Sequence, residues 1–68
     1  MSVRAKFVCS FVSDNVIYMN PVYSGSEENK SFFNATPGGQ ITLNVLNESA
    51  RKQFEQGKEY YIDFTKVE

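Results

Sequence analysis

The side chains of this 68-residue chain that could carry acid–base or nucleophilic chemistry are eight carboxylates and one thiol, and histidine is absent. Most carboxylates fall in predicted turns or at predicted helix starts, where they cap a helix or stay solvated. Asp63 is the exception, because it lies between Ile62 and Phe64 in a predicted strand. Cys9 has no histidine to activate it and lies among apolar residues, so we expect a buried, inert thiol. The sequence therefore predicts a protein that is not an enzyme.

The chain also lacks the residue patterns that hold metals, cofactors or phosphate. There is no Cys/His cluster that could bind zinc. The run Thr36-Pro37-Gly38-Gly39 lacks the later Gly-Lys-Ser/Thr of a phosphate-binding loop. Residues 24–27 have the form of an anion-binding helix start, but Glu27 and Glu28 would repel an anion. We predict neither a cofactor nor a metal.

Exposed tyrosines and charges on three predicted strands are the candidates for binding. Mixed charge with tyrosine and arginine anchors is typical of protein contacts, and self-association belongs to the same class. Protein binding through the outer face of the first hairpin and the last strand is therefore the favoured function. The predicted binding residues are Arg4, Lys6, Tyr18, Tyr61 and Asp63.

Two other kinds of binding stay open. Small barrels of the OB type bind single-stranded nucleic acid through exposed aromatic rings and a basic groove. The chain has tyrosines for stacking, at positions 18, 23, 60 and 61, and basic residues near both ends. A net charge of −1 argues against a dedicated binder of duplex DNA. Capture of a nucleotide in a pocket between subunits is the other alternative.

The elements that position these residues follow from hydrophobic periodicity. Alternating apolar and polar residues predict strands over residues 2–12, 16–23, 41–45 and 58–67. Ser26 and Asn47 are candidate N-caps for helices over residues 27–34 and 48–56, with Gly57 as the C-terminal cap of the second. At least one of Phe32 and Phe33 should reach the core. The expected core faces of the strands are Val3, Ala5, Phe7, Cys9 and Phe11; Ile17 and Met19; Ile41, Leu43 and Val45; and Tyr60, Ile62 and Phe64. Tyr23 falls on the same side as Ile17 and Met19, and whether it lies in the core stays open.

These elements predict one small domain over residues 1–68, of class α+β and mainly β, in the order β-β-α-β-α-β. The connections are too short for parallel βαβ units, so we expect an antiparallel curved sheet or open barrel with two short helices. One cysteine allows no intrachain disulfide, so the core or an oligomer interface must supply the stability. No apolar run is long enough to span a membrane, and we expect a cytoplasmic protein.

Several stretches resemble a family of small uncharacterised proteins encoded by tailed bacteriophages and prophages. They are residues 21–29 (PVYSGSEEN), Phe32-Phe33, residues 36–39 (TPGG) and residues 54–65 (FEQGKEYYIDFT). The resemblance covers most of the chain after the first hairpin turn, and the hairpin itself matches least well. It implies a phage product in the cytoplasm of a bacterial host, acting on a host or phage protein in a host-takeover or counter-defence role.

Overall fold

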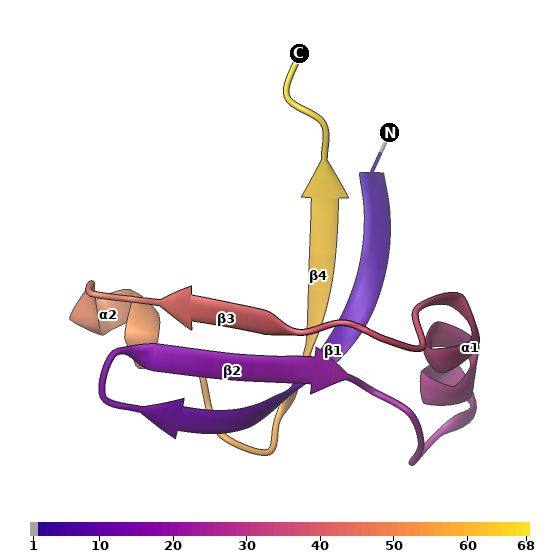
Figure 1. Ribbon diagram of the computed structural model, residues 1–68, viewed down its shortest axis with the longest axis horizontal. Coiled ribbons are helices and arrows are strands. Elements are labelled where there is room, and N and C mark those ends of the chain that lie inside the picture. Colours follow the sequence, from indigo (N-terminus) through magenta and orange to yellow (C-terminus); the bar gives the residue numbers. More distant parts are fainter. Residues whose placement is uncertain (1) are drawn as a thin grey trace.

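The computed structural model describes residues 2–68 as one curled, half-barrel antiparallel sheet with two short helices (Figure 1). This confirms the predicted α+β, mainly β class and the order of the elements. The elements are β1 (Ser2–Ser13), β2 (Val16–Pro21), α1 (Glu27–Ala35), β3 (Ile41–Asn44), α2 (Glu48–Arg51) and β4 (Glu59–Thr65).

The long strand β1 organises the sheet, whose strand order is β3-β2-β1-β4. The second half of β1 pairs with β2, and its first half pairs with β4. Within β1, Phe7 and Val8 are the residues paired with both β2 and β4. In Figure 1, β2 and β3 lie across the view whereas β4 and the first half of β1 run up it, and β3 and β4 are the free edges of the sheet.

A bulge in β1 changes which side chains face the core. Cys9 pairs with Met19 but Phe11 pairs with Tyr18, so Ser10 is the extra residue. Such an insertion reverses the alternation beyond it. Val12 consequently packs against the core, and Phe11 is 50% exposed with its ring 6.0 Å from that of Tyr18. The prediction that Phe11 faces the core is therefore wrong.

The core is small and lies on one face of the sheet. Its buried residues are Ala5, Phe7, Cys9, Ile17 and Met19, against which Val12, Ile41, Val45, Phe54, Tyr60 and Ile62 pack. Cys9 is completely buried, as predicted, and burial raises the pKa of its thiol. Tyr23, whose burial the sequence left open, is 68% exposed and lies beyond the end of β2 at Pro21. Leu43, predicted for the core, is 40% exposed on the edge strand β3.

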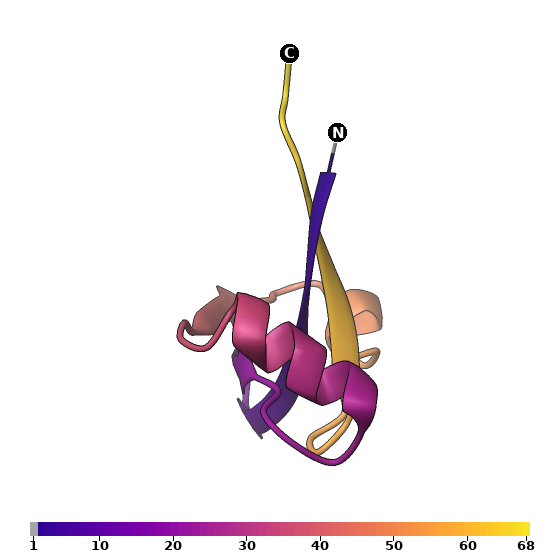
Figure 2. The ribbon, with the colours of Figure 1, turned by 90° about the vertical axis from the view of Figure 1, so that its right-hand side faces the viewer.

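The first helix lies close to its predicted bounds but covers the other face of the sheet. The Ser26 hydroxyl accepts a hydrogen bond from Asn29 N at 3.0 Å, which caps α1 as expected. Phe32 is half-buried beside Tyr61 and Phe33 is exposed, so neither ring enters the core. Figure 2 shows α1 crossing the ribbons of β1 and β4. The expectation of a core phenylalanine is wrong because α1 packs on the opposite side.

The second helix is one turn, much shorter than predicted. Asn47 Oδ1 caps it, but Gln53 N and Phe54 N donate to the carbonyls of Ala50 and Arg51, three residues back. These tighter turns end α2 and bring the Phe54 ring to 5.7 Å from that of Tyr60. Gly57, at φ +90°, is therefore no helix cap; its N–H donates to the Cys9 carbonyl at 2.8 Å just before β4.

The far ends of β1 and β4 project from this body as a two-stranded ribbon (Figure 2). We call residues 2–6 of β1 with residues 61–65 of β4 the ribbon. Val3 pairs with Phe64 there, and they are 66% and 56% exposed. Both were predicted for the core, but along the ribbon the core ends at Ala5 and Ile62. Among the described residues, no helix is long and apolar enough to cross a membrane.

Candidate functional site

Four of the five predicted binding residues meet on one face of the ribbon. Arg4 pairs with Asp63 and Lys6 with Tyr61 across β1 and β4. Paired residues of antiparallel strands point to the same side, so all four project away from the core face that carries Ala5 and Ile62. Glu59 of β4 and Glu28 of α1 complete the group. We call these six residues the polar ribbon face.

Arg4 and Asp63 form its outer end. Arg4 Nε donates to Asp63 Oδ1 at 2.7 Å and Nη2 donates to Oδ2 at 3.1 Å, a two-pronged contact. The Arg4 guanidinium hydrogen bond lowers the pKa of Asp63, and the same bond raises the pKa of Arg4. Arg4 also lies 4.7 Å from the centre of the Tyr61 ring. The side chains of Arg4 and Asp63 remain 55% and 46% exposed, so a partner could reach them.

Lys6 and Tyr61 form the inner end, where α1 approaches the ribbon. Lys6 Nζ lies 2.6 Å from Glu28 Oε2 and 3.3 Å from Glu59 Oε1, and its side chain is 12% exposed. The Tyr61 hydroxyl donates to Glu28 Oε2 at 2.9 Å. Hydrogen bonds from Lys6 and Tyr61 lower the pKa of Glu28. The bond to Glu28 raises the pKa of both Lys6 and Tyr61.

Besides Glu59 of β4, Glu28 is the member of this group that was not among the predicted binding residues. It reads as one of two acids that complement the start of a helix. Glu28 and Phe32 are four residues apart, so they share one side of α1, and both contact Tyr61. That spacing was the available signal, because it places a charge and a ring together on the side that packs.

Asn29 anchors the same helix from inside. Its Nδ2 donates to the Ser24 carbonyl at 2.9 Å and to Glu59 Oε2 at 2.8 Å, and the residue is 2% exposed. Its Oδ1 is buried without a hydrogen-bond partner among the described residues. Ser24 is thereby held beside β4, which positions one wall of a shallow pocket.

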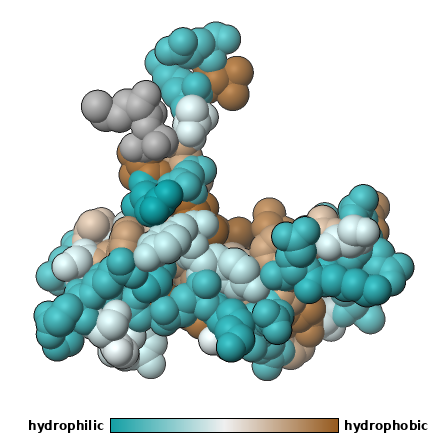
Figure 3. Space-filling view, turned by 180° about the vertical axis from the view of Figure 1, so that it is seen from behind, coloured by the Kyte–Doolittle hydropathy of each residue, from teal (hydrophilic) through white to brown (hydrophobic). Residues whose placement is uncertain are grey.

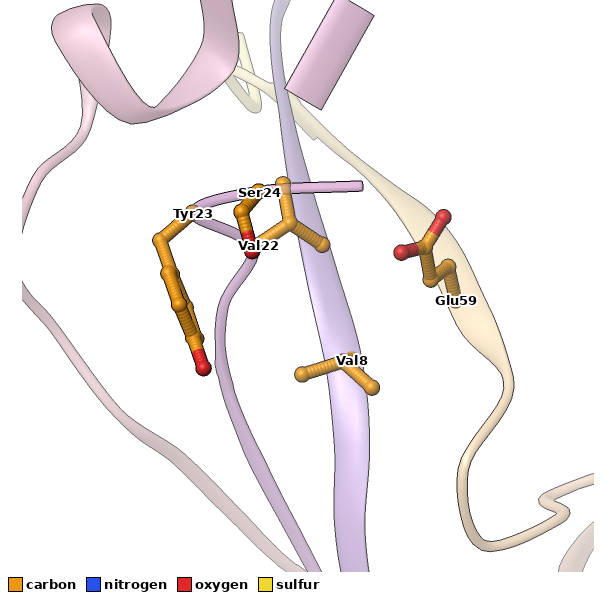
Figure 4. A pocket seen from close by; sticks show the side chains of 5 residues that line it. All are labelled: Val8, Val22, Tyr23, Ser24 and Glu59. Carbon is orange, nitrogen blue, oxygen red and sulfur yellow. The ribbon is translucent and has the colours of Figure 1, made fainter. Parts of the chain in front are cut away.

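That pocket has a volume of about 260 Å³ (Figure 4). Val8 and Val22 form its floor, and Tyr23 and the Glu59 carboxylate lie on opposite sides of it in this view. Pockets for drug-sized ligands usually measure roughly 300–1,000 Å³. The space within one chain therefore suits a single side chain or a similarly small group.

The tyrosines do not form one stacking surface. Tyr18 lies on β2 against Phe11 and has no hydrogen bond or ring contact with the polar ribbon face among residues 2–68. Tyr60 packs against the core, and its hydroxyl donates to the Gln53 carbonyl at 2.8 Å. Tyr23 and Tyr61 remain exposed, on the pocket wall and on the ribbon. Tyr18 is thus separate from the other four predicted residues.

Both cations of the polar ribbon face are paired with carboxylates of the same chain. Arg4 and Lys6 face Glu28, Glu59 and Asp63, so carboxylates outnumber cations. Within residues 2–68, no three acidic or cysteine side chains group closely enough to hold a metal ion. The arrangement offers a half-exposed ring flanked by fixed charges of both signs.

Comparisons with known proteins identify no relative of this chain. No protein-family model, no curated protein and no solved structure matches the chain. The resemblance to tailed-phage proteins therefore stays a prediction from the sequence.

Proposed function

We propose that this chain is a non-enzymatic protein-binding module whose contact surface is the polar ribbon face. The observation that carries the proposal is the position of Tyr61, which is 50% exposed beside Arg4 on paired strands. Tyrosine and arginine dominate the energetics of protein contacts, and rigid anchors lose little entropy on binding. The hydrogen bonds to Asp63 and Glu28 fix both side chains before a partner arrives.

The charge pattern favours a protein over a nucleic acid. Phosphate binding needs cations that are free to replace counterions. Lys6 is enclosed by Glu28 and Glu59, and Arg4 is engaged by Asp63. A phosphate approaching either cation would meet a carboxylate. A protein with its own charges of both signs fits such a surface better, and the pocket beside Glu59 suits one of its side chains.

The partner we propose is a bacterial host or phage protein in the cytoplasm. This part of the proposal rests on the resemblance to tailed-phage proteins. A small module that binds without transforming its target would serve host takeover or counter-defence by occupying a surface of that target.

The test exchanges the two charges of the outer pair. In the double variant Arg4→Asp with Asp63→Arg, the ion pair persists but its direction on the surface is reversed. The control exchanges Glu48→Lys with Lys52→Glu, an exposed pair 3.0 Å apart at the first residue of α2 and its C-cap. Tagged versions of wild type and both variants are used to capture proteins from bacterial lysate, followed by mass spectrometry. We expect a partner enriched by wild type and control, and reduced about tenfold or more by the Arg4 and Asp63 exchange.

Two outcomes contradict the proposal. A partner that binds the exchanged protein as well as wild type would place the contact elsewhere. Salt-sensitive retention on single-stranded DNA, lost in the Arg4 and Asp63 exchange, would show that the ribbon binds phosphate instead.

A further inference from the structure

The two faces of the ribbon differ in what they leave uncovered. Opposite the polar ribbon face, Ala5 and Ile62 join the core, but Val3 and Phe64 lie beyond it and are 66% and 56% exposed. Val67, which follows β4, is 90% exposed. Figure 3 shows brown apolar side chains on the projecting ribbon among teal polar ones. An isolated two-stranded ribbon is marginal in water, so this uncovered apolar end needs support.

The molecule as a whole exposes more surface than a chain of its mass should. Its accessible area is 5109 Å² for 7.8 kDa, whereas the usual scaling gives about 4,400 Å² for a folded monomer. Its radius of gyration is 12.7 Å, against about 11 Å for a compact domain of this length. The excess area of roughly 700 Å² is close to the ~800 Å² that each partner buries in a standard interface.

We infer that a second copy of this chain covers the apolar face of the ribbon, with Val3 and Phe64 at the centre of a two-fold interface. A two-fold contact uses the same patch on both subunits, and the ribbon brings that patch clear of each body. The neighbouring edge of β4 is free and can lie antiparallel to its own copy. A net charge of −1 gives little repulsion between copies.

This interface is independent of the proposed protein-binding surface. Strand alternation places Val3 and Phe64 on the side opposite Arg4, Tyr61 and Asp63. A dimer formed through the apolar face therefore leaves the polar ribbon face of each subunit accessible. Oligomeric state and capture of a partner protein then report on separate surfaces, so either result can fail without the other.

The test measures mass in solution by sedimentation equilibrium at about 100 μM chain, a concentration that populates dimers of micromolar Kd. We expect twice the 7.8 kDa of one chain. Phe64→Glu should raise the dimer Kd by about 100-fold or more, because it removes one aromatic anchor from each subunit. Leu46→Glu is the matched control, since Leu46 is 73% exposed but lies in the loop before α2. Far-UV circular dichroism verifies that each variant is folded.

Val3→Glu provides a second variant in case Phe64→Glu unfolds. Isotope-filtered NOEs between Phe64 ring protons of one copy and Val3 methyl protons of the other would support the assignment directly. A wild-type chain that remains monomeric at this concentration overturns the inference. So does a dimer whose Kd is unchanged in the folded Phe64 and Val3 variants, because the copies would then meet through another surface.

Discussion

At the scale of single residues, Tyr61 joins three parts of the molecule through one side chain. Its hydroxyl donates to Glu28 of α1, its ring lies 6.1 Å from that of Phe32, and Arg4 lies over the ring. The hydrogen bond between the Tyr61 hydroxyl and Glu28 raises the pKa of Tyr61 and lowers the pKa of Glu28. The docking of α1 on the ribbon should therefore depend on pH at both ends of the scale.

Tyr61→Phe should flatten that dependence. The pKa of Glu28 is lower in the folded protein, so its contribution is present above the ordinary value of about 4.3 and is lost as pH falls through the folded pKa. The pKa of Tyr61 is higher in the folded protein, so its contribution is present below about 10 and is lost as pH rises beyond that. The variant keeps the ring but removes the bond, so urea midpoints should fall less steeply in acid and in alkali.

Tyr18→Phe is the matched control for this measurement. Tyr18 makes a ring contact with Phe11, and its hydroxyl makes no hydrogen bond among residues 2–68. Its pH profile should follow that of wild type. If Tyr61→Phe gives the same profile as Tyr18→Phe, the bond from Tyr61 to Glu28 does not couple α1 to the ribbon.

Four of the predicted binding residues share the polar ribbon face, whereas Glu59 of β4 and Glu28 of α1 were not among the predicted residues. Alternation places Arg4, Lys6, Tyr61 and Asp63 on one side as soon as the terminal strands are neighbours. The spacing of Glu28 and Phe32 indicates which side of α1 packs, but the face of the sheet that receives it is decided by tertiary contacts. The predicted core position of Phe11 was wrong for a related reason. The bulge at Ser10 leaves no trace in the alternating pattern of the sequence.

At the scale of elements, α1 is held against β4 by a buried amide. Asn29→Ala would leave the Ser24 carbonyl and Glu59 without their donor and open a small space beneath the helix. We expect the free energy of unfolding to fall by about 1–3 kcal/mol, because the variant loses two hydrogen bonds, one of them to the charged Glu59. Asn34→Ala, at an exposed position of the same helix, controls for helix propensity. Equal urea midpoints for the two variants would contradict this role of Asn29.

The loop before β3 offers a comparison between adjacent glycines. Gly39 has φ +144°, and an added Cβ would lie 3.7 Å from the Phe7 ring, whereas a Cβ on Gly38 would meet nothing within 4 Å. Gly39→Ala should lower the free energy of unfolding by about 1–2 kcal/mol because an L-residue is strained there. Gly38→Ala should leave it unchanged or raise it by up to about 1 kcal/mol. Thermal denaturation of both variants checks the order, and a less stable Gly38 variant would contradict it.

The start of each helix was predictable because local capping residues determine it. The end of the second helix was not, because tertiary packing determines it. Ser26 and Asn47 cap their helices as their residue types suggest. The second helix ends early because Phe54 is drawn to Tyr60, a contact between residues on different elements. Its sequence would allow a longer helix in isolation, so the tertiary contact overrides the local preference.

At the scale of the whole molecule, the fold divides into a packed body and a ribbon that leaves it. The sequence indicated a curved antiparallel sheet and left its closure open. In the structure β3 and β4 are not paired and the barrel stays open. The first half of β1 bends away from β2, and β4, which is paired with that half, lies away from β3. The alternating pattern of the sequence cannot distinguish these two forms, because the strands of a closed barrel and of an open half-barrel alternate in the same way. The free edge and apolar face of the ribbon follow from that one bend.

Dimerisation through the ribbon should make thermal stability depend on chain concentration, because mass action stabilises any folded state that binds a second copy. For a two-state dimer of 68-residue chains, each tenfold increase should raise Tm by about 5 °C. In Phe64→Glu the Tm should stay constant over the same range, since a monomer's unfolding is independent of concentration. Leu46→Glu should retain the wild-type slope. Calorimetry over two decades of concentration tests this, and a flat wild-type Tm would show that Val3 and Phe64 stay exposed in a folded monomer.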